Sequence, residues 1–272
     1  AFVLPDAVEQ KEKGKREQEK RMKETVIMNF SGVYAEEDFY RDKEHIWMDF
    51  TRMQGVNCYC TQEAEEEIKR QIAGCSPFGL HFLDSGNYHY LSKFWLDKLE
   101  QPCDLLVFDQ HTDMQESAFF GLLSCGSWVK EVLDTNEKVR KICIVGPPKK
   151  AFAECAPEDL CRVTALCAED LKEGKTETLE AFLREDPQVP LYVSVDKDLL
   201  CRQEARTNWD QGETPLSQLF ALLDLAFSCR KTAGADICGE DPQDGSALPK
   251  EEDLRINERT NKALWEYFSE KF

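Results

Sequence analysis

The sequence predicts an α/β protein of three layers, in which helices cover both faces of a central, mainly parallel sheet of about eight strands. Short apolar runs of strand length alternate along the chain with segments of helical character, which is the pattern of strands joined by crossover helices. The 272 residues contain no linker rich in Gly, Ser or Pro that would divide them. Their number therefore fits one large domain with a sizeable core.

The predicted strands are apolar runs that end at polar or turn residues. They cover residues 25–30, 55–59, 79–83, 104–109, 142–145, 162–166, 191–195 and 234–238. The predicted helices cover residues 61–73, 91–99, 177–185, 215–229 and 254–270, and most of 117–133 with an interruption at 124–128. Thr61 precedes the acidic run Glu65-Glu66-Glu67, which is favourable chemistry for a helix N-terminus, and Gly74 supplies a stop.

The two ends of the chain differ in character. Residues 9–24 mix acidic and basic side chains with almost no apolar stripe, and we predict that residues 1–24 form a charged arm or helix outside the core. The domain proper is therefore expected to span residues 25–272. Residues 241–252, rich in Asp, Pro, Gly and Ser, predict a loop before the last helix.

Composition excludes several classes of function. A formal net charge of −18 argues against binding to nucleic acid or to an anionic membrane surface, and favours a cationic ligand. No run approaches 18 apolar residues, and no secretory leader is recognisable, so we expect a cytoplasmic protein that does not span a membrane.

Twelve cysteines raise the alternative of a secreted, disulfide-bonded protein. Several of them lie in or beside apolar runs, where a free thiol packs as a small hydrophobe, namely Cys143, Cys161, Cys167 and Cys238. Cys58 and Cys60 have no second pair at the spacing of a zinc site. We therefore expect reduced thiols and no structural zinc.

Three of the apolar runs are followed by side chains that can bind metal. One run leads into Asp109-x-His111-x-Asp113, and in an extended backbone these alternate residues would share a face. The other two runs lead to His89 and to the segment Ser194-x-Asp196-x-Asp198. Because sites in open α/β sheets form beyond the carboxyl ends of the strands, we expect the three segments to meet there.

Four carboxylates and two imidazoles are mostly hard oxygen ligands with some borderline nitrogen. Such a set suits Mn²⁺ and tolerates Fe²⁺, Co²⁺ or Zn²⁺. Six side chains exceed what one ion takes while leaving room for water. The sequence therefore favours two divalent ions, most readily Mn²⁺, that share bridging carboxylates.

These motifs, in this order, resemble the metal-binding set of the arginase, agmatinase and formiminoglutamase superfamily, which shares its fold with the histone deacetylases. Gly212-Glu213-Thr214-Pro215 and Ala235-Asp236-Ile237 are similar to further segments of that superfamily, and the resemblance covers residues 25–270. It implies the arginase/deacetylase fold. It also implies a set of ligands for one ion, His89, Asp109, Asp113 and Asp196, and a set for the other, His111 and Asp198 with Asp109 and Asp196 bridging.

The same resemblance implies a reaction. A hydroxide that bridges the two ions would attack an sp² carbon and hydrolyse a non-peptide C–N bond of a small guanidino, formimino or amide substrate. Asp113 and His111 would act in catalysis through this hydroxide. Members of the superfamily often form homo-oligomers, which is therefore also expected of this chain.

The sequence departs from the superfamily in the residues that would recognise substrate. Gly239 occupies the position of a Glu that pairs with the guanidinium in arginases and agmatinases, and Glu240 lies one residue later. A shift of one residue turns a side chain to another face unless a bulge compensates. A histidine proposed as a proton shuttle in arginases has no counterpart in residues 124–128. We therefore expect a substrate other than arginine.

Other side chains are weaker candidates for contact with substrate, namely Glu240, Trp209, Asp210 and Cys125. Lys197 is expected to be structural or ion-paired, and His45 and His81 are expected to lie outside the site. Two alternatives remain open for the function. One is a metal-binding protein of this fold without turnover, and the other is a deacetylase-like amidase, which would need a Tyr or His above the metal.

Overall fold

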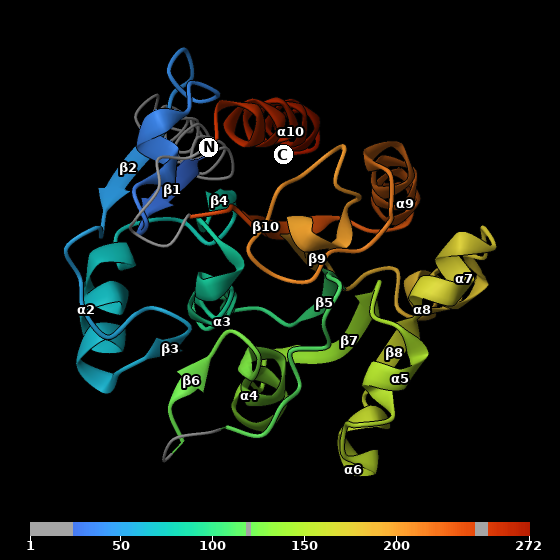
Figure 1. Cartoon of the computed structure of the whole chain (residues 1–272). Helices are drawn as coiled ribbons and strands as arrows, with labels where there is room; N and C mark the ends of the chain where they lie inside the picture. Colours follow the sequence, from blue (N-terminus) through green and yellow to red (C-terminus); the bar gives the residue numbers. More distant parts are fainter. Residues whose placement is uncertain (1–23, 118–120, 243–249) are drawn as a thin grey trace, which may run out of the picture.

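The central sheet has eight strands, and every pair of neighbours in it is parallel, with the order β2-β1-β4-β10-β9-β5-β7-β8 (Figure 1). The structure is a computed structural model that describes residues 24–117, 121–242 and 250–272. The strands are β1 (Thr25–Asn29), β2 (Ile46–Asp49), β4 (Leu80–Phe82), β5 (Cys103–Phe108), β7 (Val139–Val145), β8 (Val163–Leu166), β9 (Leu191–Asp196) and β10 (Thr232–Cys238). The predicted α/β class with about eight parallel strands is confirmed.

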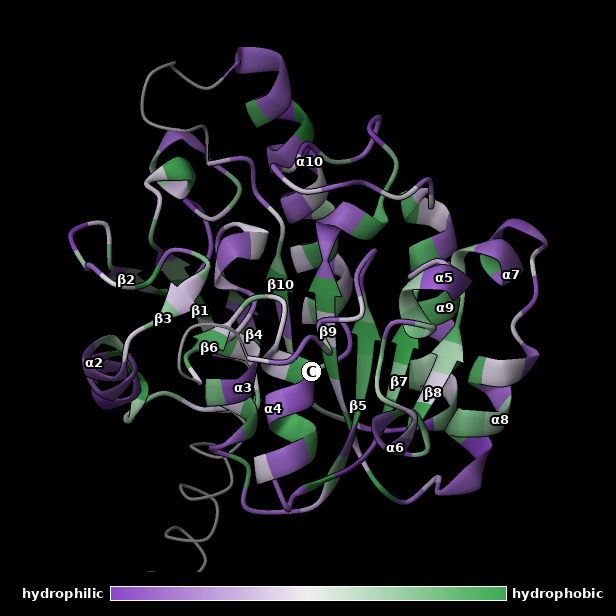
Figure 2. Cartoon of the chain, turned by 60° about the horizontal axis from the view of Figure 1, so that its bottom comes forward, coloured by the Kyte–Doolittle hydropathy of each residue, from purple (hydrophilic) through white to green (hydrophobic). Residues whose placement is uncertain are grey.

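Helices cover both faces of this sheet, as Figure 1 shows. One face carries α2 (Gln62–Ile72), α3 (Leu91–Leu96) and α4 (Trp128–Thr135), and the other carries α8 (Glu177–Glu185), α9 (Leu216–Cys229) and α10 (Glu251–Ser269). Side chains alternate along each strand, so that Leu105 and Val107 join the core of the first face, while Leu106 and Phe108 join the core of the second. The central strands are accordingly mostly apolar (Figure 2).

Several predicted helices agree closely with the structure. Helix α2 begins after Thr61, whose hydroxyl accepts a hydrogen bond from the backbone N–H of Ala64 at 3.3 Å, so the predicted N-cap is present. The helices predicted at 177–185, 215–229 and 254–270 correspond to α8, α9 and α10 within a few residues. Short helices not expected from sequence follow β7 and β8, namely α5 (Lys149–Phe152), α6 (Pro157–Leu160) and α7 (Ala168–Lys172).

The prediction of a sheet strand at residues 55–59 is wrong. Only Tyr59–Cys60 is extended, as β3, and it pairs antiparallel with β6 (Leu123–Ser124) outside the central sheet. The eighth strand is β2, which pairs with β1 at the edge of the sheet. This edge strand is short and only half-buried, and its apolar run of Ile46–Met48 lies between charged residues, so it gives a weaker signal than a longer, buried strand.

The helix predicted over most of residues 117–133 is confirmed only from Trp128, where α4 starts, and wrong before it, where β6 is a strand. Cys161 is exposed and does not pack as expected, whereas Cys143, Cys167 and Cys238 are buried. The predicted charged arm at residues 1–24 lies, apart from Glu24, outside the described residues. Among the described helices, none combines the length and hydrophobicity that crossing a membrane requires.

Candidate metal centre

The four central strands deliver polar side chains to one edge of the sheet. β4, β10, β9 and β5 are consecutive neighbours, and their carboxyl ends lie side by side. Asp196 ends β9, Cys238 ends β10, and Asp109 follows β5 directly. After β4 the chain passes through a short 3₁₀ helix, η2 (Gly86–Tyr88), to His89. Strand order therefore brings together residues that are far apart in the sequence.

Tight turns, rather than an extended backbone, arrange the two carboxylate motifs. Asp109 Oδ1 accepts the backbone N–H of His111 at 2.6 Å, and Asp196 Oδ1 accepts the backbone N–H of Asp198 at 2.9 Å. Both are turns in which an Asp side chain binds the backbone two residues later. Asp113 has a positive φ of 50°. The expected extended alternation is therefore wrong, although the side chains do meet.

His89 lies at the centre of the first group. Its Nδ1 atom is 3.1 Å from Asp109 Oδ2, 3.1 Å from Asp113 Oδ2 and 3.5 Å from Asp196 Oδ2. All four side chains are almost completely buried. A single imidazole nitrogen thus faces three carboxylate oxygens.

A hydrogen bond at the other ring nitrogen of His89, Nε2, fixes the tautomer and the orientation of the ring. The Ser194 hydroxyl donates to Asp236 Oδ1 at 2.6 Å, because an ionised carboxylate only accepts. Ser194 Oγ therefore accepts the Nε2–H of His89, at 2.8 Å. In the neutral imidazole this leaves a bare lone pair on Nδ1, which has no hydrogen-bond partner.

A lone pair that faces three carboxylates is favourable only when a cation lies between them. Burial alone lowers the pKa of His89, but Cys238, Asp109 and Asp113 outweigh it and hold that pKa well above its usual range. In the absence of metal, the cation is thus a proton on Nδ1. A divalent ion would satisfy the same lone pair and the same carboxylates, so these residues fit a metal.

His111 forms a second group in which one imidazole nitrogen again faces carboxylate oxygens. Its Nδ1 atom lies 2.8 Å from Asp198 Oδ2 and 3.4 Å from Asp109 Oδ1. Burial alone lowers the pKa of His111, yet the two carboxylates raise it to about 12. Asp109 thus turns one oxygen toward His89 and the other toward His111. This is the arrangement that a carboxylate bridging two cations requires.

The carboxylates of the centre repel one another. Burial and then the charges of Asp198 and Asp109 raise the pKa of Asp196 to about 7. Burial and then the charge of Asp109 raise the pKa of Asp198 to about 6. With four carboxylates against two imidazoles, the cluster carries excess negative charge that divalent cations would neutralise.

Three residues that shape the centre, Trp128, Ser194 and Asp236, had no site role predicted from the sequence. Trp128 donates its indole N–H to Asp113 Oδ2 at 2.7 Å, and its ring lies 4.8 Å from that of His89. Ser194 and Asp236 pair in register on neighbouring strands, β9 and β10. Polar residues inside otherwise apolar strands were the signal that could have identified this pair.

A cavity of about 360 Å³ opens beside the cluster. Its lining includes His111 and Asp113 from the centre, the predicted candidate Asp210, and Lys150 and Glu154. Trp209 lies close by, with its ring 5.9 Å from that of His111, and its indole N–H donates to Asn87 Oδ1 at 2.8 Å. Asp210 and Trp209 therefore lie beside the candidate site, and their contact with substrate stays a prediction.

Glu240 does not contact this cavity, so its assignment as a substrate-binding residue is wrong. It is completely buried, forms an ion pair with Lys197 and accepts amide N–H groups of Asn257 and Asn261, each at 2.7 Å. Lys197 is therefore an ion-paired structural residue, as predicted. Gly239 instead faces the centre, since a Cβ added there would lie 2.5 Å from Asp196 Oδ1.

The candidate Cys125 is structural in this fold, and His81 and His45, which were expected to lie outside the site, do not contribute to it. Cys125 is buried and is not among the described residues that line the cavity. Its backbone N–H donates a hydrogen bond to the Cys58 carbonyl at 2.9 Å, and its thiol lowers the pKa of Cys58 to about 7. His81 is buried, stacks on Trp95 at 3.7 Å and makes hydrogen bonds within the core. His45 packs against Tyr40, away from the centre.

An eight-stranded parallel sheet with imidazoles and carboxylates gathered beyond its central strands defines an α/β protein with a candidate dinuclear metal site. The model of the arginase family matches residues 20–244, so the chain belongs to the arginase family.

Comparison with individual proteins agrees with this assignment. An uncharacterized protein of Thermotoga maritima is 26% identical over 238 residues, which are 85% of this chain and 86% of the relative. The proclavaminate amidino hydrolase of Streptomyces clavuligerus has a TM-score of 0.65 at 14% identity, over 91% of this chain and 92% of that one. A formiminoglutamase of Trypanosoma cruzi solved with Mn²⁺ has a TM-score of 0.63 at 11% identity, over 92% and 94%. At these identities the structures share the fold.

Proposed function

We propose that this protein is a hydrolase of a non-peptide C–N bond that uses two divalent metal ions. The observation that carries the proposal is the pair of imidazoles on either side of Asp109, since each of its oxygens faces a different histidine. Membership of the arginase family supports this reaction class. The fold shared with an amidino hydrolase and with a formiminoglutamase solved with Mn²⁺ is consistent with it.

The residues that would hold the ions follow from the two groups. His89 with Asp109, Asp113 and Asp196 would hold one ion, and His111 with Asp109 and Asp198 would hold the other. The family resemblance adds Asp196 as a ligand that the second ion would share. We expect Mn²⁺ from the predominance of oxygen donors. When bound, the two ions would act as Lewis acids that lower the pKa of a water and polarise the C–N group of a substrate.

Asp113 is the carboxylate best placed to move protons. It lies in the centre and also lines the cavity, where a substrate would enter. Its Oδ2 is held by the Trp128 indole, so the side chain has a fixed orientation. We assign Asp113 the transfer of a proton from the attacking water to the leaving nitrogen. His111 borders the same cavity and would position the reacting group beside the metal pair.

The substrate we propose is a small guanidino, formimino or amide compound other than arginine. Asp210 and Glu154 offer negative charge to a cationic C–N group, and Lys150 can receive an anionic substituent of the same molecule. Glu240 is turned away from the cavity toward Asn261, and Gly239, at the position of the Glu that binds guanidinium in arginases, has no side chain. No carboxylate at either residue is therefore available to bind a guanidinium. We also propose that the enzyme acts in the cytoplasm, where its cysteine thiols stay reduced.

Metal analysis of protein purified without chelator, followed by a substrate screen, tests this function. We expect about two transition-metal ions per chain and Mn²⁺-dependent release of ammonia, urea or formamide from at least one guanidino or formimino compound. Asp109→Asn should abolish turnover, while Asp134→Asn, at an exposed residue that pairs with Lys130, should leave turnover unchanged. Less than about one ion per chain, with no activity on any compound, contradicts the proposal.

The two alternatives give different results in the same screen. A binding protein without turnover would hold metal but hydrolyse nothing, and the missing shuttle histidine is the observation in its favour. A deacetylase-like amidase would act on acetylamino compounds. The lining of the cavity includes no tyrosine and no histidine except His111 among the described residues, which disfavours the amidase.

A further inference from the structure

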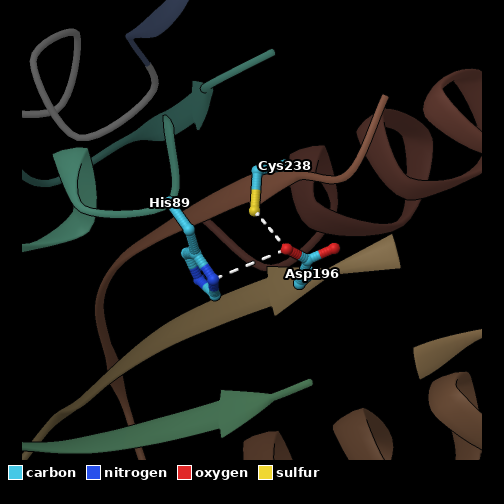
Figure 3. Close-up of side chains that lie close together, drawn as sticks. All are labelled: His89, Asp196 and Cys238. Carbon is cyan, nitrogen blue, oxygen red and sulfur yellow. Dashed lines mark hydrogen bonds and ion pairs between the residues drawn. The ribbon is translucent and has the colours of Figure 1, made fainter. Parts of the chain in front are cut away.

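Cys238 places a thiol at the edge of the His89 group. It is the last residue of β10, pairs in register with Asp196 on β9, and is completely buried. Its Sγ lies 3.1 Å from Asp196 Oδ2, the oxygen that also faces His89 (Figure 3). Figure 3 shows the thiol, the imidazole and the carboxylate converging from three elements.

The spacing of these three donors matches a metal coordination shell. A donor atom of each residue lies within 4.8 Å of those of the other two. Neighbouring ligands at about 2.0 Å for oxygen or nitrogen and about 2.3 Å for sulfur are roughly 2.8–3.5 Å apart at the ligand–metal–ligand angles usual in proteins. The separations of 3.1 Å for Cys238–Asp196 and 3.5 Å for His89–Asp196 lie in this range.

A second observation points to the same position. The His89 Nδ1 atom is buried, has no hydrogen-bond partner and is directed at the oxygen that the thiol also contacts. Cys143 and Cys238 are both buried thiols of the sheet that belong to apolar cores, but Cys238 also contacts the Asp196 carboxylate. Cys238 therefore does more than fill space in the core.

We propose that Cys238 is a further ligand of the ion at His89 and binds it as a thiolate, with the thiol proton released to solvent. This inference rests on the metal centre of the proposed function. A thiolate is a soft donor that favours Zn²⁺, Co²⁺ or Fe²⁺, whereas the group of His111, Asp109 and Asp198 has only nitrogen and oxygen donors among the described residues. The two metal positions are thus chemically unequal: both accept Mn²⁺, but the one at His89 binds Zn²⁺, Co²⁺ or Fe²⁺ more tightly.

Absorption spectroscopy of the Co²⁺-loaded full chain tests the thiolate directly. We expect a sulfur-to-cobalt charge-transfer band in the near ultraviolet for the unchanged protein and for Cys143→Ala, the matched control. The band should be absent in Cys238→Ala and Cys238→Ser, of which the second keeps the side-chain size if the first unfolds. Visible ligand-field bands report whether Co²⁺ is bound at all.

The outcomes separate this inference from the proposed function. Ligand-field bands without a charge-transfer band in the unchanged protein, or a charge-transfer band that survives in both Cys238 variants, overturn the thiolate while leaving the metal centre intact. A protein that binds no Co²⁺ overturns both. In a chelator competition, Cys238→Ser should weaken Zn²⁺ binding about 10- to 100-fold and Mn²⁺ binding less. Equal losses for the two metals also overturn the thiolate.

Discussion

Ser194→Ala tests how the fold presents His89 to a metal. The Ser194 hydroxyl accepts the Nε2–H of His89 at 2.8 Å and donates its own hydrogen bond to Asp236 Oδ1 at 2.6 Å. Without it, the imidazole loses the contact that fixes both its tautomer and its orientation. A ligand histidine whose second nitrogen is unsupported binds metal more weakly.

The expected loss follows from two separate estimates. Leaving the buried Nε2–H of His89 without an acceptor costs about 1–3 kcal/mol. Loss of such a supporting residue typically weakens metal affinity about 10- to 100-fold. At roughly 1.4 kcal/mol per tenfold change, that range corresponds to about 1.4–2.7 kcal/mol. Because the estimates agree, we expect Mn²⁺ to bind Ser194→Ala about 10- to 100-fold more weakly.

Competition with a fluorescent chelator measures the affinity, and thermal unfolding with and without Mn²⁺ measures its effect on stability. The stabilisation by metal should fall by the same free energy, since it follows the ratio of metal concentration to Kd. Ser92→Ala is the matched control, because its hydroxyl lies 3.3 Å from Ser194 Oγ and is one step further from the imidazole. If Ser194→Ala binds Mn²⁺ as tightly as Ser92→Ala, the tautomer argument is refuted.

Three further predictions concern the surroundings of the centre. Lys197→Met leaves the buried Glu240 without its cation and should lower the free energy of unfolding, measured in urea, by about 3–5 kcal/mol. Combining Lys197→Met with Glu240→Gln should recover part of this loss, and no recovery would contradict the pairing. Gly239 has a φ of 98°, and a Cβ added there would lie 2.5 Å from Asp196 Oδ1. Gly239→Ala should therefore abolish metal binding in a chelator competition assay. Unchanged metal affinity would show that the backbone can shift to accommodate the methyl group. In the metal-free protein, the raised pKa values of Asp196 (about 7) and Asp198 (about 6) give the folded state stability that is present below pH 4 and lost as the pH rises to about 7. Because Mn²⁺ neutralises these carboxylates, the increase in Tm on adding Mn²⁺ should grow from pH 5 to pH 8. An increase in Tm that does not depend on pH would be inconsistent with these pKa shifts.

The sequence by itself determined the fold class and the main members of the candidate site. Apolar runs that end in Asp109-x-His111-x-Asp113 or in Asp196-x-Asp198 reveal strands and ligand-type residues together, because hydrophobic run length and side-chain chemistry are both local properties. For the same reason the capped start of α2 after Thr61 could be predicted. The misplaced strand at 55–59 shows the limit, since a short edge strand such as β2 carries little local signal.

Only the tertiary structure decided which residues complete the centre. Cys238 and Asp236 belong to β10, which lies between β4 and β9 although about 40 residues separate it from β9 and more than 140 from β4 along the chain. That order sets Asp236 beside Ser194 and Cys238 beside Asp196, and it buries Glu240 against Lys197. Strand order and the turns at strand ends result from packing of the whole sheet over both cores, so no short stretch of sequence encodes them.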